Sequence, residues 1–283
     1  MKDYKPMPRK DFTNPLKDDV KLKELTADDR VKTHDFSIGI ESELGFSIKS
    51  LIGGDSTLFN TGVGNNFIFS TNKKLSETVS SFNRRTYKAP GNLSKLTVRL
   101  NELEKESIFL NYEAIQSDQL WRNLKMIDGD LPEILAWALY YRWSSRKSKL
   151  NEVAEILEEK DPMNFYNGQN STQKFYEYKI KRFLTEAAMG MTSETPWNGE
   201  YDSFGGVIIA KKDGDILCFH VYDFNLFRNY LINNTFFEQP STGEDRNNPG
   251  NPKSTGKKYH YGWLYEENNE LKYKINLQIR FIK

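Results

Sequence analysis

The chain has 283 residues, 37% of them hydrophobic, and a formal net charge of +1 at pH 7. This composition is typical of a globular chain that buries a core, and it excludes an intrinsically disordered one. Because the net charge is close to zero, there is no overall attraction to nucleic acid or to a membrane surface, and a nucleic-acid partner would require locally clustered basic residues.

The N-terminal stretch and the apolar runs predict a cytoplasmic protein without a membrane segment. MKDYKPMPRKDF lacks the apolar core of a signal peptide. The longest apolar run, ILAWALYY over residues 134–141, is much shorter than a membrane span. The single cysteine, Cys218, excludes a disulfide framework within one chain, and we interpret it as a buried structural thiol.

The clearest strand signal in the first 70 residues is LGFSIKS, residues 44–50. Its apolar residues alternate with polar ones, and this period of two places Ser47 and Lys49 together on one face of a strand. One interpretation is an ordinary half-buried strand with a solvated lysine. The other is a lysine that acts together with a second polar group on its own face.

Residues 73–190 are mostly helical in pattern. We expect helices in LSKLTVRLNELEKE, SDQLWRNLKMI, LPEILAWALYYRW, LNEVAEILEE and QKFYEYKIKRFLTEAAMG. Pro132 suits the first turn of its helix, and Gly190 suits a helix C-terminus.

Residues 204–281 return to strand patterns. GGVIIAKKDGDILCFHVY predicts a β-hairpin that turns at Asp213-Gly214. NYLINNTFFEQ continues the strand region, and two more strands are expected around Glu267–Glu270. This order of elements predicts an α/β (α+β) fold with a mixed central sheet. We expect one domain over residues 1–283, with a helical insertion at about 73–195 and a β-rich part at about 200–283.

Three polar side chains near the N-terminus could carry chemistry together. If the chain forms a hairpin that folds near Gly39, Asp29 lies beside Lys49, with Ser47 close to both. Carboxylates bind Mg²⁺, a hard cation, and a lysine near a metal-bound water can orient it and balance the charge of a phosphorane. Glu24, on a preceding helix, is a candidate for a second metal-binding carboxylate.

Longer blocks of the sequence carry a family resemblance. They are LGFSIKSLIGGDSTLFNTGVGNNFIF, GGVIIAKKDGDILCFHVYDFNLFRNYLINNTFFEQPST and YGWLYEENNELKYKINLQIRF. Over about 35–281 these blocks resemble the HpaII-type type II restriction endonucleases, and the acid–spacer–lysine arrangement resembles that of the PD-(D/E)XK nucleases. The resemblance implies a central sheet of that nuclease type, with Asp29 as the metal-binding acid and Lys49 as the motif lysine. Ser47 stands where the motif usually has Asp or Glu.

The same resemblance implies a Mg²⁺-dependent, sequence-specific endonuclease of double-stranded DNA. It would cut a short GC-containing palindrome such as CCGG and leave 5′-phosphate and 3′-hydroxyl ends. Symmetric cleavage would require a homodimer or transient pairing on DNA. In the cell, a cognate DNA methyltransferase would accompany the enzyme without binding to it.

Several polar side chains are candidate DNA contacts. The loop over residues 53–66 is rich in Gly, Ser, Thr and Asn, which suits phosphate contact as well as an ordinary turn. In KINLQIRF, alternation predicts one strand whose polar face is either solvated or reads bases. The resulting set is Ser50, Thr57, Asn60, Asn65, Arg246, His260, Gln278 and Arg280.

Three basic clusters are candidates for phosphate contact, although charged helix faces are usually only solvated. They are Arg84–Arg85–Lys88, Arg142–Arg146–Lys147–Lys149 and Lys179–Lys181–Arg182. Two alternatives to the endonuclease stay open: a DNA-binding module that has the nuclease fold but does not cleave, and a small-molecule enzyme whose Gly/Asn-rich loop binds a nucleotide.

Overall fold

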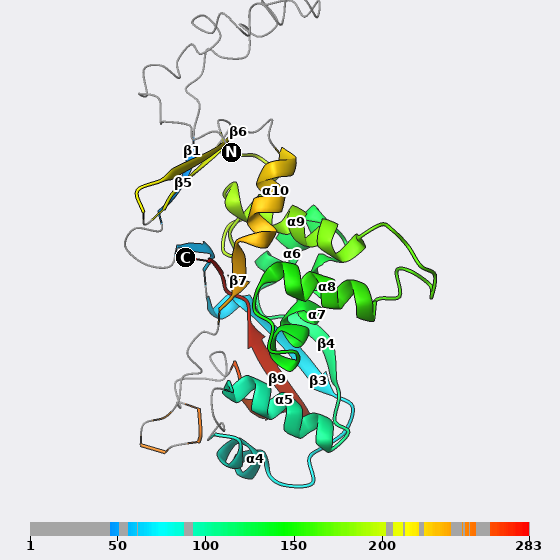
Figure 1. Ribbon diagram of the computed structural model, residues 1–283. Coiled ribbons are helices and arrows are strands. Elements are labelled where there is room, and N and C mark those ends of the chain that lie inside the picture. The colour runs from blue at the N-terminus through cyan, green and yellow to red at the C-terminus, as the bar shows by residue number, and fades with distance from the viewer. Residues whose placement is uncertain are drawn as a thin grey trace, which may run out of the picture. The chain divides into compact units, whose positions relative to one another are not determined.

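The computed structural model describes the chain in several ranges (Figure 1). They are residues 46–50, 56–60, 62–87, 93–201, 206–211, 213–220, 224–238, 245, 247–248, 250–252 and 261–282. The expected hairpin at Gly39 lies outside them. Contacts divide the chain into two units, which we call the small unit (residues 1–54, 201–226 and 283) and the large unit (residues 55–200 and 227–282).

The small unit contains one three-stranded mixed sheet. Its strands are β1 (Phe46–Ser50), β5 (Gly206–Ala210) and β6 (Ile216–His220), in the order β1-β5-β6. Strand β1 runs parallel to β5, and β5 runs antiparallel to β6. Gly214, with φ of 91°, occupies the turn between β5 and β6, where glycine meets no steric cost. The predicted hairpin at Asp213-Gly214 is therefore confirmed.

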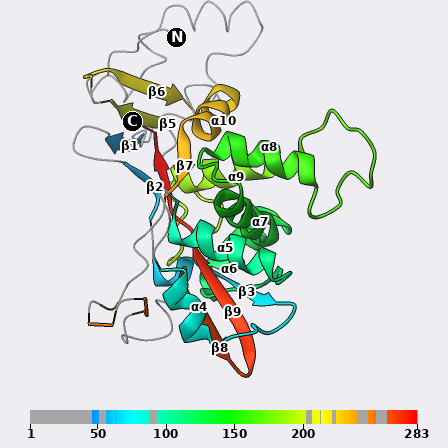
Figure 2. The same ribbon diagram turned by 60° about the horizontal axis from the view of Figure 1, so that its bottom comes forward.

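The large unit contains two antiparallel sheets. The four-stranded sheet has the order β4-β3-β9-β8, and β3 and β9 lie side by side at its centre (Figure 2). Its strands are β3 (Asn66–Thr71), β4 (Leu110–Ile115), β8 (Leu264–Glu267) and β9 (Glu270–Asn276). The second sheet has the order β2-β10-β7 and comprises β2 (Thr57–Phe59), β7 (Thr235–Phe237) and β10 (Ile279–Phe281). The two strands predicted around Glu267–Glu270 are confirmed as β8 and β9.

The described part of the chain contains seven α-helices and a short 3₁₀ helix, Val63–Asn65. The α-helices are α4 (Val79–Arg85), α5 (Lys95–Lys105), α6 (Asp118–Ile127), α7 (Leu131–Ser144), α8 (Leu150–Lys160), α9 (Phe175–Ala188) and α10 (Phe224–Asn233). Helix α7 packs against α5, α6, α8, α9 and β4, which explains why its sequence is apolar almost all round. All five predicted helices are confirmed, and the fold is α+β.

Helix ends follow from local side-chain chemistry. The hydroxyls of Ser94 and Ser117 accept hydrogen bonds from the backbone N–H groups of Thr97 and Leu120, so they cap α5 and α6. Gly190 has φ of 124° and follows Met189, the C-cap residue of α9, as predicted for a helix C-terminus.

Three expectations about secondary structure are wrong. The segment before β7 is a helix, α10, because Phe227, Leu231 and Ile232 recur at helical spacing and are buried. A strand, β4, lies within the predicted helical block and pairs with β3. KINLQIRF is divided: β9 ends at Asn276 and β10 begins at Ile279, in a different sheet.

A buried arginine fastens α5 to the four-stranded sheet. The guanidinium of Arg99 is fully buried and donates hydrogen bonds to the hydroxyl of Thr86 (3.1 Å) and to the carbonyl of Gly262. It also lies 4.1 Å from the ring centroid of Trp263. Burial of a charge is tolerated where hydrogen-bond acceptors and a ring face replace its water.

We expect the Arg99→Met variant to lose about 3 kcal/mol of unfolding free energy, because buried acceptors then have no donor. Urea denaturation measures this loss. In the control variant Lys105→Met, on the same helix but exposed, the change should stay within about 0.5 kcal/mol. Equal losses in the two variants would contradict the anchoring role of Arg99.

Gly64 approaches the N-terminus of α6 closely. A methyl group at Gly64 would lie 2.8 Å from the Cβ atom of Ser117, whereas one at Gly129 would meet nothing within 4 Å. We expect Gly64→Ala to cost about 1–3 kcal/mol through overpacking and Gly129→Ala to be neutral or slightly stabilising. Thermal melting of both variants checks the difference. A Gly64→Ala variant as stable as the parent would show that the backbone around Gly64 can move away from Ser117 without a loss of stability.

Candidate functional site

Lys49 lies on the buried face of the small sheet. Its register partner on β5 is Ile209, so both side chains point to the same side of the sheet. Ile209 is fully buried, as is Val207 two residues earlier, whereas Ile48 on the opposite face is 69% exposed. Ile48 and Lys49 thus lie on opposite faces, as the alternation predicts, but the lysine, not the isoleucine, faces the interior.

Burial changes the chemistry of the Lys49 amine. The side chain is half-buried, and desolvation lowers its pKa below the ordinary 10.5, since a charged amine is less stable away from water. Within the described ranges no carboxylate forms an ion pair with it. This environment does not fit the solvated-lysine interpretation and is typical of functional lysines.

The acidic half of the predicted site lies outside the described residues. This applies to Asp29 and Glu24, while Ser47 pairs through its backbone register with Val207. In the part of the chain that the structure describes, no group of three or more His, Cys, Asp and Glu side chains could hold a metal ion. The described residues thus supply the lysine, and the Mg²⁺ site stays a prediction.

The predicted DNA contacts fall into three groups. Arg246 and His260, together with the side chain of Ser50, are not among the described positions. Thr57, Asn60 and Arg280 are half-buried or exposed, at or near the β2-β10-β7 sheet. Asn65 and Gln278 are buried.

Burial of Asn65 and Gln278 corrects the expected polar strand face. The carbonyl of Gln278 accepts a hydrogen bond from the backbone N–H of Glu238 at 3.0 Å. The amide of Asn65 donates to the carbonyl of Asn60 at 2.5 Å. Neither side chain reaches a base edge without local opening, so the structure favours structural roles for both.

Buried amides link β9, β3 and the loops next to them at this point. The amide nitrogen of Asn276 donates to the carbonyl of Gly62 (2.9 Å) and to Oδ1 of Asn66 (2.8 Å). Asn66 in turn donates to Oε1 of Gln116 at 3.0 Å. Alternation in KINLQIRF places Asn276 on the polar face of the predicted strand. Its hydrogen-bond partners are distant in the sequence, so only the structure reveals them.

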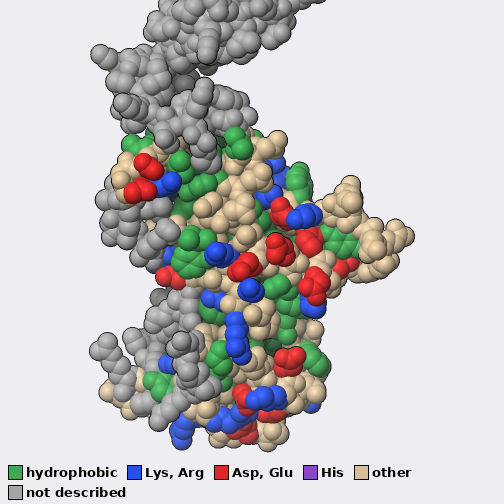
Figure 3. All heavy atoms as spheres, viewed as in Figure 1, with side chains coloured by type: hydrophobic (Ala, Val, Ile, Leu, Met, Phe, Trp, Pro, Cys, Tyr) green, Lys and Arg blue, Asp and Glu red, His purple; other side chains and the backbone are tan. Residues whose placement is uncertain are grey.

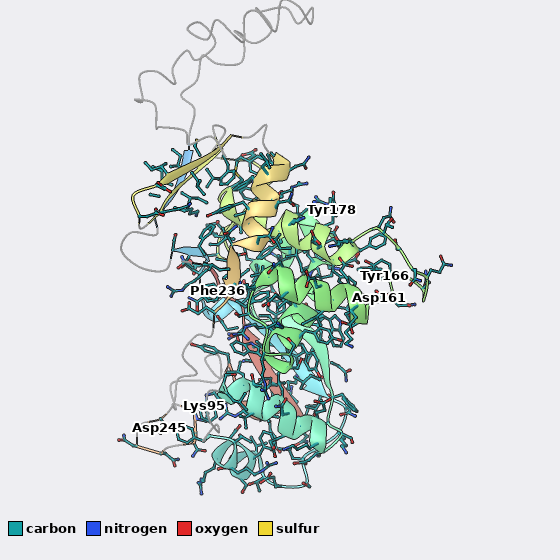
Figure 4. All side chains as sticks on the ribbon, viewed as in Figure 1. Lys95, Asp161, Tyr166, Tyr178, Phe236 and Asp245 are labelled. Carbon is teal, nitrogen blue, oxygen red and sulfur yellow. The ribbon has the colours of Figure 1, made fainter. Side chains whose placement is uncertain are left out.

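One row of side chains crosses the outer face of the β2-β10-β7 sheet. Arg280 pairs in register with Thr57 on one side and with Phe236 on the other, and Phe236 forms a bridge with Lys149 beyond the end of the sheet. Partners in register point to the same side, and all four side chains are half-buried or exposed. Phe236, labelled in Figure 4, comes from β7 at the border of the helices. We call these four residues the sheet row.

The sheet row joins two residues from the predicted DNA set, Thr57 and Arg280, to two outside it. Lys149 belongs to a predicted basic cluster, whereas the run TFFE has no period-two alternation that would have singled out Phe236. The guanidinium of Arg280 forms an ion pair with the carboxylate of Glu238. On the face in Figure 3, basic and acidic side chains are interspersed, so that any anion-binding site must be local.

The described helices include none that is long and apolar enough to cross a membrane.

Comparisons with known proteins agree with this picture of the chain. Residues 14–281 match the family described as HpaII restriction endonuclease. The chain is 33% identical over 256 residues to the type II restriction enzyme HpaII of Haemophilus parainfluenzae, in an alignment that covers 90% of this chain and 65% of that enzyme. The chain thus spans just under two thirds of the length of this relative. No solved structure matches. Since the family match extends over nearly the whole sequence, the chain belongs to the HpaII restriction endonuclease family.

Proposed function

We propose that this protein is a type II site-specific endonuclease that hydrolyses double-stranded DNA. Family membership over residues 14–281 supports the reaction class. The observation that carries the assignment of chemistry is the half-buried Lys49, held on the interior face of a mixed sheet next to fully buried Ile209. In a family of DNA-cleaving enzymes, a half-buried lysine of this kind is a better candidate for a catalytic role than a solvated surface lysine.

In the proposed reaction, the oxygen of a water molecule attacks phosphorus and the bond from phosphorus to O3′ breaks. The products are a 5′-phosphate and a 3′-hydroxyl, and the leaving oxygen takes up a proton. The amine of Lys49 orients the attacking water and balances the negative charge that builds up on the phosphoryl oxygens. Partial burial strengthens this electrostatic effect, since the surroundings screen charge less than water does.

A divalent cation, Mg²⁺ in our proposal, would supply Lewis-acid chemistry and charge neutralisation. The residues that would hold it are Asp29 and Glu24, whose carboxylate oxygens are the ligands that this ion prefers. Ser47, with only a hydroxyl at the usual acid position of the motif, adds no charge to the site.

We further propose a short GC-containing palindrome such as CCGG as the target. Cutting both strands symmetrically requires two active sites, so two copies of the chain would act together as a homodimer or pair transiently on DNA. A cognate methyltransferase in the same cell would protect the target.

One observation favours a second candidate, a DNA-binding module with a nuclease-like fold and no cleavage activity. Ser47 replaces the carboxylate that the motif usually carries at this position. A single metal-binding carboxylate beside the lysine would then bind the cation weakly.

We expect Lys49→Ala to reduce plasmid cleavage in the presence of Mg²⁺ by at least about 100-fold, the usual loss when one charge-stabilising group is removed. Agarose-gel analysis of plasmid digests checks this, with run-off sequencing of the ends to give the target and cut position. Lys211→Ala, at the end of β5 in the same unit, is the matched control and should cut normally. If neither the parent nor the control cuts, while both bind DNA, the non-cleaving module is the better description.

Lys49→Met should raise the melting temperature at pH 7, because it removes a charge that burial makes unfavourable. The sign follows from the lowered pKa of Lys49. The folded state binds this proton more weakly than the unfolded chain does, so wild-type stability rises as pH increases through the folded pKa towards 10.5. The difference between the variant and the parent should therefore shrink between pH 7 and pH 10.5 in thermal melts. A variant less stable than the parent at pH 7 would mean that the amine is well paired.

A further inference from the structure

The three predicted basic clusters differ in how their charges are balanced. In the first, the guanidinium of Arg85 contacts three carboxylates, those of Glu77 (2.5 Å), Glu102 (2.6 Å) and Glu106 (2.9 Å). Such a network neutralises its cation and leaves little for an external anion. Arg85 is therefore a structural tie between α4 and α5. Arg84 is exposed and forms no ion pair within the described ranges, and Lys88 lies outside them.

The third cluster is neutralised in the same way. The amine of Lys179 lies 2.6 Å from a carboxylate oxygen of Asp128 and 2.9 Å from one of Asp130. Lys181 pairs with Glu177 at 2.5 Å. The contacts of Lys179 fasten α9 to the loop between α6 and α7, the pair of Lys181 lies within α9, and we assign both to stability.

The second cluster has the largest number of uncompensated charges: among the residues that the structure describes, three of its four cations have no acidic partner. Arg142, Arg146 and Lys149 form no ion pair within the described ranges, whereas Lys147 pairs with Glu152 at 3.2 Å. Arg146 and Lys149 are exposed. Positive charge is thus concentrated where α7 ends and α8 begins.

Arg142 is held in place without being neutralised. Its Nε donates to the backbone carbonyl of Phe237 at 3.3 Å, and its guanidinium carbon lies 4.1 Å from the ring centroid of Trp143. Burial lowers its pKa to about 10, which leaves it charged at neutral pH. Its other guanidinium N–H groups have no hydrogen-bond partner among the described residues, and a fixed, half-buried guanidinium of this kind is suited to paired hydrogen bonds with a phosphate.

Backbone pairing joins this cluster to the sheet row. The backbone N–H of Phe237 donates to the carbonyl of Ser148 at 2.9 Å, next to the bridge between Lys149 and Phe236. The row from Thr57 to Lys149 crosses three inter-strand spacings, about 14 Å in all. That length corresponds to about four base-pair steps of 3.4 Å along a duplex.

We propose that Arg142, Arg146 and Lys149 bind phosphates of the duplex DNA backbone and that Phe236 and Arg280 form the adjoining floor of the contact surface. This proposal rests on the proposed endonuclease function and adds a binding site for the backbone of its substrate. Charge complementarity supports DNA as the ligand, because several uncompensated cations in one short segment attract the regularly spaced, negatively charged phosphates of a polynucleotide.

The test is the salt dependence of duplex binding, measured by fluorescence anisotropy without divalent cation on a labelled 30-base-pair duplex. We expect Lys149→Gln and Arg142→Gln each to lower the slope of log affinity against log salt by about 0.9, the value for one lost phosphate contact. Arg142→Lys should keep the slope while weakening binding, because the charge remains and the paired hydrogen bonds are lost.

Lys147→Gln is the matched control, since it removes the same charge from the same segment but from an ion-paired lysine; its slope should be that of the parent. Thermal melts verify that each variant is folded, and Lys149, whose side chain is exposed, keeps the test valid should Arg142→Gln unfold. Two results would overturn the assignment of this site, provided that the parent protein binds DNA. One is an unchanged salt slope for Lys149→Gln, and the other is a decrease of the salt slope for Lys147→Gln as large as that for Lys149→Gln. A folded parent that binds no duplex at low salt would instead overturn the proposed function and this site with it.

Discussion

The large unit depends on the passage of the chain from one sheet to the other between β9 and β10. Leu277 donates its backbone N–H to the carbonyl of Asn65 at 2.9 Å, and the carbonyl of Gln278 accepts from Glu238. Asn276 adds its amide hydrogen bonds to Gly62 and Asn66. These contacts hold β10 between β2 and β7, so they also fix the positions of Arg280 and of the side chains in register with it.

In the small unit, the direction of the Lys49 side chain works against stability. Its sheet turns Lys49 towards the interior and leaves Ile48 in solvent, the reverse of what hydrophobicity alone favours. This arrangement lowers the stability of the folded state, which is common where a side chain is retained for its chemistry. Together with family membership, this is the physical basis on which we assign a role to the lysine.

Local signals in the sequence were sufficient for much of the fold. The Asp-Gly turn, the glycine at a helix end and helical periodicity depend on neighbours within a few residues, and the corresponding helices and the β5–β6 hairpin were predicted correctly. Helix α10 was missed because its apolar residues also suit a strand, and β4 because it is short and enclosed by helices. Gln278 was misjudged because strand alternation does not reveal that the chain changes sheets at that point.

Local sequence signals predicted less of the candidate site than of the fold. Lys49 could be found from its strand pattern and from the family resemblance, but its inward direction depends on the pairing with Ile209, which lies 160 positions later. The sheet row likewise joins residues from β2, β7, β10 and the start of α8. The balance of charge in the basic clusters depends largely on carboxylates from other segments of the chain, such as Glu102 for Arg85 and Asp128 for Lys179, which no local pattern indicates.

The parallel pairing of β1 with β5 also has a consequence for biosynthesis. Helices α4 to α9 lie between these strands in the sequence, so within the described part of the chain the strand of Lys49 has no partner until Gly206–Ala210 has left the ribosome. At about 5–20 residues per second, that delay is on the order of 10 s. A nascent chain would therefore complete helices α4 to α9 before it could pair the lysine strand with β5, and any chemistry that depends on this placement of Lys49 could begin only late in translation.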